Sequence, residues 1–246
     1  MARRCIFCGR SDDMSNEHIV AQRFQKLFGD QPIRKVRGSP GGPMREWDGR
    51  LFDAKVKLVC QQNCNGGWMR EMDDRVEPLL SPMLIGGSRK LTQVDQRIVA
   101  AWAYRVALLY QYRRDTHPVG SPDRARLFYQ NKEASPDSAI WLAEFGPNAG
   151  TGAISGLTSM KRNDGRDFEG VLTTVRAGHL VFQVLEVPGW GRIGVTMPES
   201  EQRRSVQIWP TNSGTRVWPP IHRLDNSELL RFAERFTNEN AQWPVT

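Results

Sequence analysis

Apolar and polar residues alternate between Ala54 and Val59, and this alternation predicts a strand with one buried face. The stretch before it, residues 30–53, is rich in glycine, proline and basic residues, which favours a long hairpin or loop over a helix. Residues 17–28 predict a short extended piece followed by one or two turns of helix, and Gly29 suits the end of that helix. The first quarter of the chain is therefore expected to consist of short elements.

Two helices are predicted in the middle of the chain, because apolar side chains recur there every third or fourth residue. The first begins after Asn65 and ends near Pro78, since proline interrupts the hydrogen bonds of a helix. The second spans residues 94–114 and has an apolar side made of Ile98, Trp102, Val106 and Leu109. Proline and glycine in residues 77–90 mark a boundary between two parts of the chain.

The rest of the chain is expected to be mostly β until its last helix. β-Branched and aromatic residues are frequent in residues 139–145, 171–187 and 205–210. A turn is predicted at Ala177 and Gly178, within the second of these segments. A last helix is expected over residues 227–236, with Ser227 as its N-cap and Glu228 in its first turn.

The predicted fold class is α+β, with an N-terminal module in residues 1–80 and an α+β domain of unknown role in residues 90–246. With 39% hydrophobic and 25% charged residues, the composition is that of an ordinary water-soluble protein. No run of 18 apolar residues and no secretory signal occurs, so we expect no membrane partner and a cytoplasmic location. The net charge of +7 favours a polyanionic partner such as nucleic acid, although a need for solubility explains it equally well.

All four cysteines lie within residues 5–64 in two close pairs, Cys5 with Cys8 and Cys60 with Cys64. Disulfides are reduced in the cytoplasm, so two close pairs separated by a long insert indicate a tetrahedral thiolate site for zinc. The short spacing lets both sulfurs of a pair reach one ion, and Gly9 relaxes the turn after the first pair. The alternative is four unrelated buried thiols, but random placement would rarely gather every cysteine into two pairs.

An acid and an imidazole stand side by side at Glu17 and His18, nine residues after Cys8. Such a pair is usually a solvated surface feature. Asn65 directly follows the last cysteine, however, so a zinc ion that joined the two pairs would draw Asn65 toward Glu17 and His18. A carboxylate, an amide oxygen and an imidazole suit a hard-cation site with a neighbouring general base. Asp73, two helical turns after Asn65, could touch the same ion, but a solvated helix face is the more frequent case.

In order, residue type and approximate spacing, the motifs Cys-x-x-Cys, Glu-His and Cys-x-x-x-Cys-Asn resemble the HNH endonuclease family over residues 5–77. In the four-cysteine members of that family a structural zinc joins a hairpin to a helix, in a treble-clef-like ββα-metal fold, and a second divalent ion takes part in the chemistry. The resemblance implies that Glu17 and Asn65 hold a catalytic Mg²⁺ or Mn²⁺ ion and that His18 is the general base. The implied zinc ligands are Cys5, Cys8, Cys60 and Cys64. The family more often has Asp or His in place of Glu17, and two residues between its last cysteines.

The resemblance therefore implies a metal-dependent hydrolase of phosphodiester bonds, with DNA as the expected substrate and RNA as an alternative. A neutral His18 would take a proton from the attacking water, and the ion would stabilise charge on the leaving 3′ oxygen. Two other functions stay open: a zinc-finger-like nucleic-acid-binding module with a vestigial active site, and a structural interaction protein. The presence of Glu17, His18 and Asn65 favours the nuclease over the binding module, and the basic charge disfavours the structural protein. The sequence makes no prediction about cleavage specificity, biological setting or oligomeric state.

Overall fold

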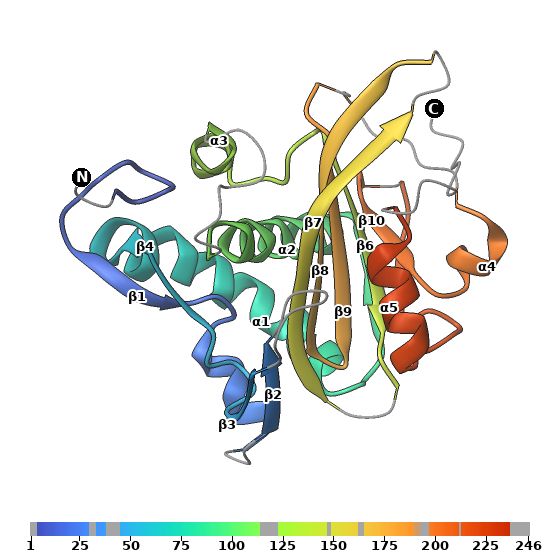
Figure 1. Ribbon diagram of the computed structural model, residues 1–246. Helices are drawn as coiled ribbons and strands as arrows, with labels where there is room; N and C mark the ends of the chain where they lie inside the picture. Colours follow the sequence, from blue (N-terminus) through green and yellow to red (C-terminus); the bar gives the residue numbers. More distant parts are fainter. Residues whose placement is uncertain are drawn as a thin grey trace.

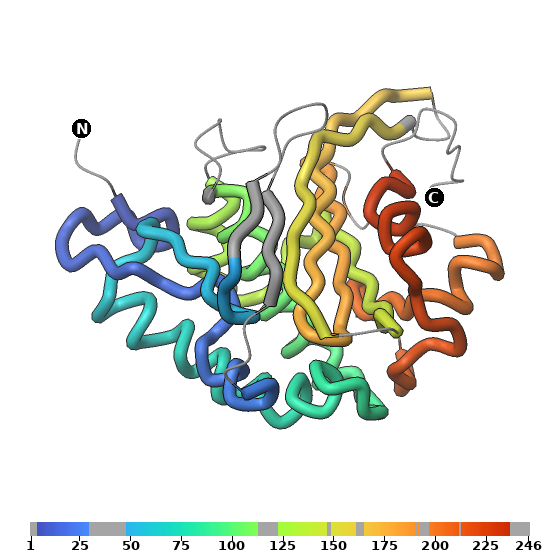
Figure 2. The backbone as a smooth tube through the Cα atoms, turned by 60° about the horizontal axis from the view of Figure 1, so that its bottom comes forward, coloured from blue at the N-terminus to red at the C-terminus, as the bar shows by residue number. Residues whose placement is uncertain are grey.

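The computed structural model of the protein describes residues 4–29, 33–37, 45–113, 123–146, 149–161, 165–189, 191, 197–211 and 213–236. The fold is mixed α+β, as predicted, and its centre is a five-stranded sheet flanked by helices (Figure 1). The N-terminal elements and helix α5 (Asn226–Glu234) lie on opposite sides of this sheet (Figure 2). None of the helices in the described part of the chain is long and apolar enough to cross a membrane.

The N-terminal quarter contains a hairpin whose two strands are far apart in the sequence. Strand β1 (Met14–His18) pairs antiparallel with β4 (Lys55–Cys60), which confirms the strand predicted before Cys60. Gly29 has a φ of 67°, the left-handed conformation expected at the end of the predicted short helix. The insert between the two strands holds the 3₁₀ helix η1 (Gln22–Leu27) and the hairpin of β2 (Ile33–Arg37) with β3 (Arg45–Gly49).

Helix α1 is longer than the sequence predicted. The chain leaves β4 through the wide helical turn η2 (Gln61–Met69) and continues as α1 (Arg70–Leu84), which includes Pro78 and Pro82. The prediction that this helix ends near Pro78 was therefore wrong. A proline removes one hydrogen bond of the helix, and burial of the apolar side chains in the following turn outweighs this loss. Those side chains are Leu79, Leu80, Met83 and Leu84.

Helix α2 (Gln93–Arg113) is the predicted second helix, and it lies across one face of the central sheet (Figure 1). The sequence predicted an amphipathic helix, but every residue from Val99 to Leu109 is buried. The helix is enclosed because α1 packs on one side of it and the sheet on the other. Arg105 lies within this buried stretch, and a buried charge requires buried partners.

The central sheet is antiparallel and has the strand order β10-β6-β9-β8-β7. Its strands are β6 (Ser138–Glu144), β7 (Gly150–Lys161), β8 (Asp167–Gly178), β9 (Leu180–Glu186) and β10 (Val206–Trp209). All except β7, whose many small residues give a weak strand signal, were predicted. Ile140 and Phe182 belong to the hydrophobic cluster around α2, whereas their neighbours Trp141 and Val181 belong to the cluster beneath α5. Both faces of the sheet are therefore covered.

The remaining elements are short. They are β5 (Arg89–Leu91), which pairs with β11 (Arg216–Trp218), and the helices α3 (Asp123–Asn131) and α4 (Glu199–Gln202). Helix α5 was predicted, but its N-cap is Asp225 and not Ser227. The Asp225 carboxylate accepts from the Glu228 N–H (2.8 Å), and the Glu228 carboxylate accepts from the Asp225 N–H (3.1 Å). Ser227 donates its hydroxyl to the same Asp225 carboxylate (2.8 Å).

The predicted boundary at residues 77–90 does not coincide with a break in the hydrophobic core. Most of that stretch belongs to α1, which packs against α2. One cluster of buried residues contains Phe7 and Val59 from the N-terminal module together with Trp102 and Phe182 from the C-terminal part. The N-terminal hairpin and the sheet therefore share one core, which α1 and α2 connect.

Gly178, in the turn between β8 and β9, joins the sheet to the end of α1. Its φ is 64°, and a Cβ atom at this position would lie 2.3 Å from the Leu84 carbonyl oxygen and 2.6 Å from the Phe28 ring. We expect Gly178→Ala to lower the free energy of unfolding by about 3 kcal/mol or more, because it combines backbone strain with a steric clash. Denaturant unfolding measures this loss. Gly152→Ala is the control, since a Cβ at Gly152 would meet nothing within 4 Å, and equal losses in both variants would contradict the packing.

Candidate metal centre

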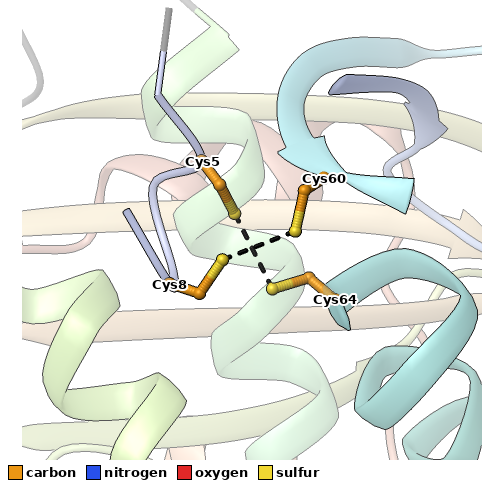
Figure 3. Close-up of side chains that lie close together, drawn as sticks. All are labelled: Cys5, Cys8, Cys60 and Cys64. Carbon is orange, nitrogen blue, oxygen red and sulfur yellow. Dashed lines mark hydrogen bonds between the residues drawn. The ribbon is translucent and has the colours of Figure 1, made fainter. Parts of the chain in front are cut away.

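The first two cysteines lie in a tight turn that precedes β1. The Gly9 N–H donates to the Cys5 carbonyl (2.9 Å), and the Cys5 N–H donates to the Arg10 carbonyl (2.6 Å). Gly9 has a φ of 77°, a conformation that side chains disfavour, which supports the role predicted for this glycine. The turn directs the side chains of Cys5 and Cys8 toward the second pair (Figure 3).

The second cysteine pair lies at the junction between strand β4 and helix α1. Cys60 is the last residue of β4, and Cys64 lies in the turn η2 that leads into α1. The Ile6 N–H donates to the Leu58 carbonyl (3.0 Å), so the first turn is hydrogen-bonded to the strand that ends at Cys60. The first turn, the hairpin and the start of the helix therefore meet at one place.

The four sulfur atoms form a compact group (Figure 3). Cys5 Sγ lies 3.7 Å from Cys64 Sγ, Cys8 Sγ lies 3.4 Å from Cys60 Sγ, and all four are within 4.8 Å of one another. A tetrahedral zinc ion with Zn–S distances of about 2.3 Å requires sulfur–sulfur distances of about 3.8 Å. The group thus has the donor type, number and spacing that fit a zinc ion, and the cysteines are not four unrelated thiols.

The thiols of Cys5, Cys60 and Cys64 have pKa values that depend on the neighbouring sulfur atoms. The hydrogen bond between Cys5 and Cys64 lowers the pKa of Cys5 to about 4 and raises the pKa of Cys64. Burial, together with the hydrogen bond to Cys8, raises the pKa of Cys60 to about 11. One thiolate therefore opposes the ionisation of its neighbours. A divalent cation among the sulfurs would reverse this effect, because it stabilises a thiolate at every ligand position.

Glu17, on β1, faces the interior between the two long helices. It is 8% exposed, and its charge interacts with Arg105 of α2 and Asp73 of α1. Arg105 donates to the Asp73 carboxylate (2.6 Å) and to the Met69 carbonyl (3.1 Å). Burial raises the pKa of Glu17 to about 7, while the Arg105 guanidinium lowers this pKa and Asp73 raises it. Glu17, Asp73 and Arg105 form a buried charge cluster that connects β1, α1 and α2.

His18 has a different environment, because adjacent residues of a strand point to opposite faces. It is half-buried and lies opposite Lys55 in the β1–β4 hairpin. Burial lowers the pKa of His18, and the Lys55 ammonium lowers it further, while Asp53 has the opposite effect. The imidazole is therefore neutral at pH 7, which is the form that can accept a proton.

Asn65 lies beside the cysteine group, at the start of the helical segment. Its side-chain nitrogen donates to the Gln61 side-chain oxygen (3.1 Å), one turn earlier. The residue whose charge acts on Glu17 is Asp73, which lies in α1, beyond the break in the helical segment at Gly67. The structure thus brings Glu17 together with Asp73 and Arg105, whereas the hydrogen bond of Asn65 stays within its own turn.

Two residues of the buried charge cluster were not assigned from the sequence. Asp73 was expected on a solvated helix face, but it is 4% exposed and also accepts from the Trp102 Nε1–H (3.1 Å). That expectation was wrong because α2 packs against this side of α1. Arg105 carried a signal, since a single charge within an apolar helix is expected to have a buried partner. The identity of that partner depends on how the two helices pack.

We expect the purified protein to carry one zinc ion per chain, because four thiolates complete the tetrahedral shell of the ion. Elemental analysis of folded, reduced protein measures the content. Cys64→Ser should lose most of the zinc and lower the Tm, whereas Ser11→Ala, an exposed change close to the first turn, should alter neither. Folded and reduced protein without zinc would contradict the metal centre.

The burial of Glu17 predicts a pH dependence of stability. Because the pKa of Glu17 rises from 4.5 to about 7 on folding, its stabilising effect is complete below about pH 4.5 and is lost as the pH rises through about 7. Glu17→Gln cannot ionise at this position. As the pH rises from about 4.5 to about 7, the free energy of unfolding of the variant should therefore increase by about 3 kcal/mol relative to that of the parent. Urea unfolding from pH 5 to 8 in excess zinc should show most of that gain. Glu71→Gln, at an exposed position of α1, is the control and should follow the parent; parallel curves for all three proteins would refute the effect.

The comparisons with known proteins found no match, so the function has to be inferred from the sequence motifs and the geometry of this region. No family model matches the chain, and no curated protein and no solved structure matches it either. The resemblance to HNH endonucleases therefore rests on the motif residues alone.

Proposed function

We propose that this protein is a metal-dependent nuclease of the HNH type, which hydrolyses phosphodiester bonds of DNA. One observation carries the proposal: the four-cysteine group joins the hairpin that bears Glu17 and His18 to the start of α1. A hairpin and a following helix held by a zinc site are the arrangement that the sequence resemblance implies. The group has the geometry for zinc, and it holds the start of α1 at the Met14–Cys60 end of the hairpin whose other end bears Glu17 and His18.

His18 is suited to be the general base of this reaction. Its imidazole is neutral at pH 7 and only half-buried, so a water molecule can reach it. Lys55, opposite His18, and Lys57, further along β4, are both exposed and can contact phosphate oxygens. We therefore place the nucleic acid next to His18 and these two lysines on the exposed side of the hairpin.

The ligands that the resemblance assigns to a catalytic Mg²⁺ or Mn²⁺ ion are Glu17 and Asn65, whose oxygen atoms are hard donors. Glu17 lies on the buried face of β1, opposite His18, so this role requires its carboxylate to leave the charge cluster when the ion binds. Such an ion would stabilise negative charge on the phosphate and on the leaving oxygen. The Asn65 amide donates through its nitrogen to Gln61, so its oxygen is the end that remains for an ion. With a pKa of about 7, Glu17 presents mostly a carboxylate at pH 8 and mostly a neutral acid at pH 6.

A second candidate function is nucleic-acid binding without cleavage. It is favoured by the position of Glu17, which is buried beside Arg105 and Asp73 and lies on the opposite face of β1 from His18. In this alternative the charge cluster only holds β1, α1 and α2 together. The exposed lysines of β4 would then bind phosphates through charge alone.

We expect His18→Ala to slow the cleavage of supercoiled plasmid by about 10²- to 10⁴-fold while DNA binding is retained, because only the proton acceptor is removed. The assay uses the full chain with Mg²⁺, Mn²⁺ or EDTA, and single-stranded DNA and RNA serve as further substrates. His222→Ala removes an exposed imidazole from the C-terminal part, so it is the matched control and should cut like the parent.

Two outcomes would refute parts of this proposal. If His18→Ala cuts as fast as the parent, His18 is not the general base. If the parent holds zinc and binds DNA but cuts no nucleic acid with any divalent ion, the binding module replaces the nuclease. Glu17→Ala and Asn65→Ala should recover part of their activity at high Mn²⁺, whereas His18→Ala should not, because its missing function is proton transfer.

A further inference from the structure

Lys132 occupies a backbone position that lysine normally avoids. It directly follows α3, its N–H donates to the Phe128 carbonyl (2.7 Å), and its φ is 57°. This is the left-handed residue that ends many helices, and glycine or asparagine usually fills it because a larger side chain strains the backbone. A strained backbone persists where the surrounding structure holds it in place, and the environment of the Lys132 side chain indicates why lysine stands here.

The ammonium group of Lys132 lies against two aromatic rings. Its Nζ is 4.5 Å from the centre of the Trp68 ring and 3.7 Å from the centre of the Tyr129 ring. It also donates to the Tyr129 carbonyl. The cation is thus fixed in place by its own helix end and by a residue of η2.

Both of these aromatic residues belong to the covering of the cysteine group. Trp68 lies one helical turn after Cys64, and its ring packs edge-on against Phe7, between the first two cysteines, with the ring centres 5.2 Å apart. The Tyr129 hydroxyl accepts from the side-chain nitrogen of Asn63 (3.1 Å), the residue before Cys64. Lys132 is therefore held on the aromatic layer that covers one side of the sulfur atoms.

A zinc ion with four thiolates carries a net charge of −2, and such a charge is unfavourable in a partly buried place unless a cation offsets it. Burial lowers the pKa of Lys132, and the Cys64 sulfur, which interacts electrostatically with the ammonium, opposes part of this decrease. Cation and sulfur group therefore act on each other across the interface between α3 and η2.

We propose that Lys132 is the counter-cation of the zinc-tetrathiolate centre, and that α3 supplies this charge from the C-terminal part of the chain. This role rests on the zinc centre and is independent of nuclease activity. Lys132 is a positioning residue for the metal centre and not a ligand. Its removal should leave the four sulfur ligands in place and weaken their hold on zinc.

Zinc affinity of the full-length protein, measured by competition with a chromophoric chelator, tests this role with Zn²⁺ alone as the probe. Lys132→Gln should lower the affinity about 10- to 100-fold, the range found when partners of metal ligands are removed. Lys132→Arg keeps the charge and should stay close to the parent. Lys132→Asn loses the charge but suits the left-handed backbone, so it should fold well and still lose affinity. Lys90→Gln removes an exposed charge from β5 and is the matched control.

Co²⁺ provides a second readout, because its absorption reports the number of thiolate ligands directly. The tetrathiolate spectrum should be unchanged in Lys132→Gln once enough Co²⁺ is added, since all four cysteines remain. Equal zinc affinity in parent, Lys132→Gln and Lys132→Asn would overturn the proposal, as would an equal loss in Lys132→Arg and Lys132→Gln. If the parent protein does not bind zinc, both the zinc centre and this role of Lys132 are refuted. If the parent binds zinc but does not cleave nucleic acid, only the nuclease proposal is refuted.

Discussion

The spacing of four sulfur atoms is the constraint on which the N-terminal half of this protein depends. Cys5 and Cys8 come from a turn, Cys60 ends a strand and Cys64 stands in the first turn of the following helix, and their sulfurs lie within 4.8 Å of one another. These elements are short and could not hold a fixed geometry individually. A single ion of the zinc type, held by all four, would fix the turn, the hairpin and the helix relative to one another.

A second constraint is the burial of charge between the helices. Asp73 pairs with the Arg105 guanidinium, and the Glu17 carboxyl lies close enough to both to interact with their charges, in a region nearly closed to solvent. Unpaired burial of any of these groups would be strongly unfavourable, so the cluster fixes the register of β1 against α1 and α2. Because strand residues alternate, orienting Glu17 inward also turns His18 outward, next to the exposed Lys55. One buried interaction thereby decides which face of the hairpin is available for chemistry.

The metal centre and the sheet are parts of one structure. Arg105, which faces Glu17, belongs to α2, and Lys132, which lies over Trp68, follows α3, so both come from beyond the N-terminal module. Helix α2 packs against the sheet with its other side, and the same hydrophobic cluster extends from Phe7 to Phe182. The C-terminal part therefore supplies cations that lie close to the charged groups of the N-terminal module.

The sequence determined the features that depend on neighbouring residues. The spacing of the cysteines indicated their grouping, alternation indicated β4, and apolar periodicity indicated α1 and α2, because each pattern follows from local geometry. The sequence did not determine where α1 ends, since Pro78 signals a stop and only packing against α2 overrides it. It did not reveal that Asp73 is buried, that Arg105 is its partner or that Lys132 reaches Trp68. Those contacts join residues that are 32 to 64 positions apart in the sequence. They form because burying side chains between packed helices is favourable, and a local sequence pattern does not specify which distant helices pack together.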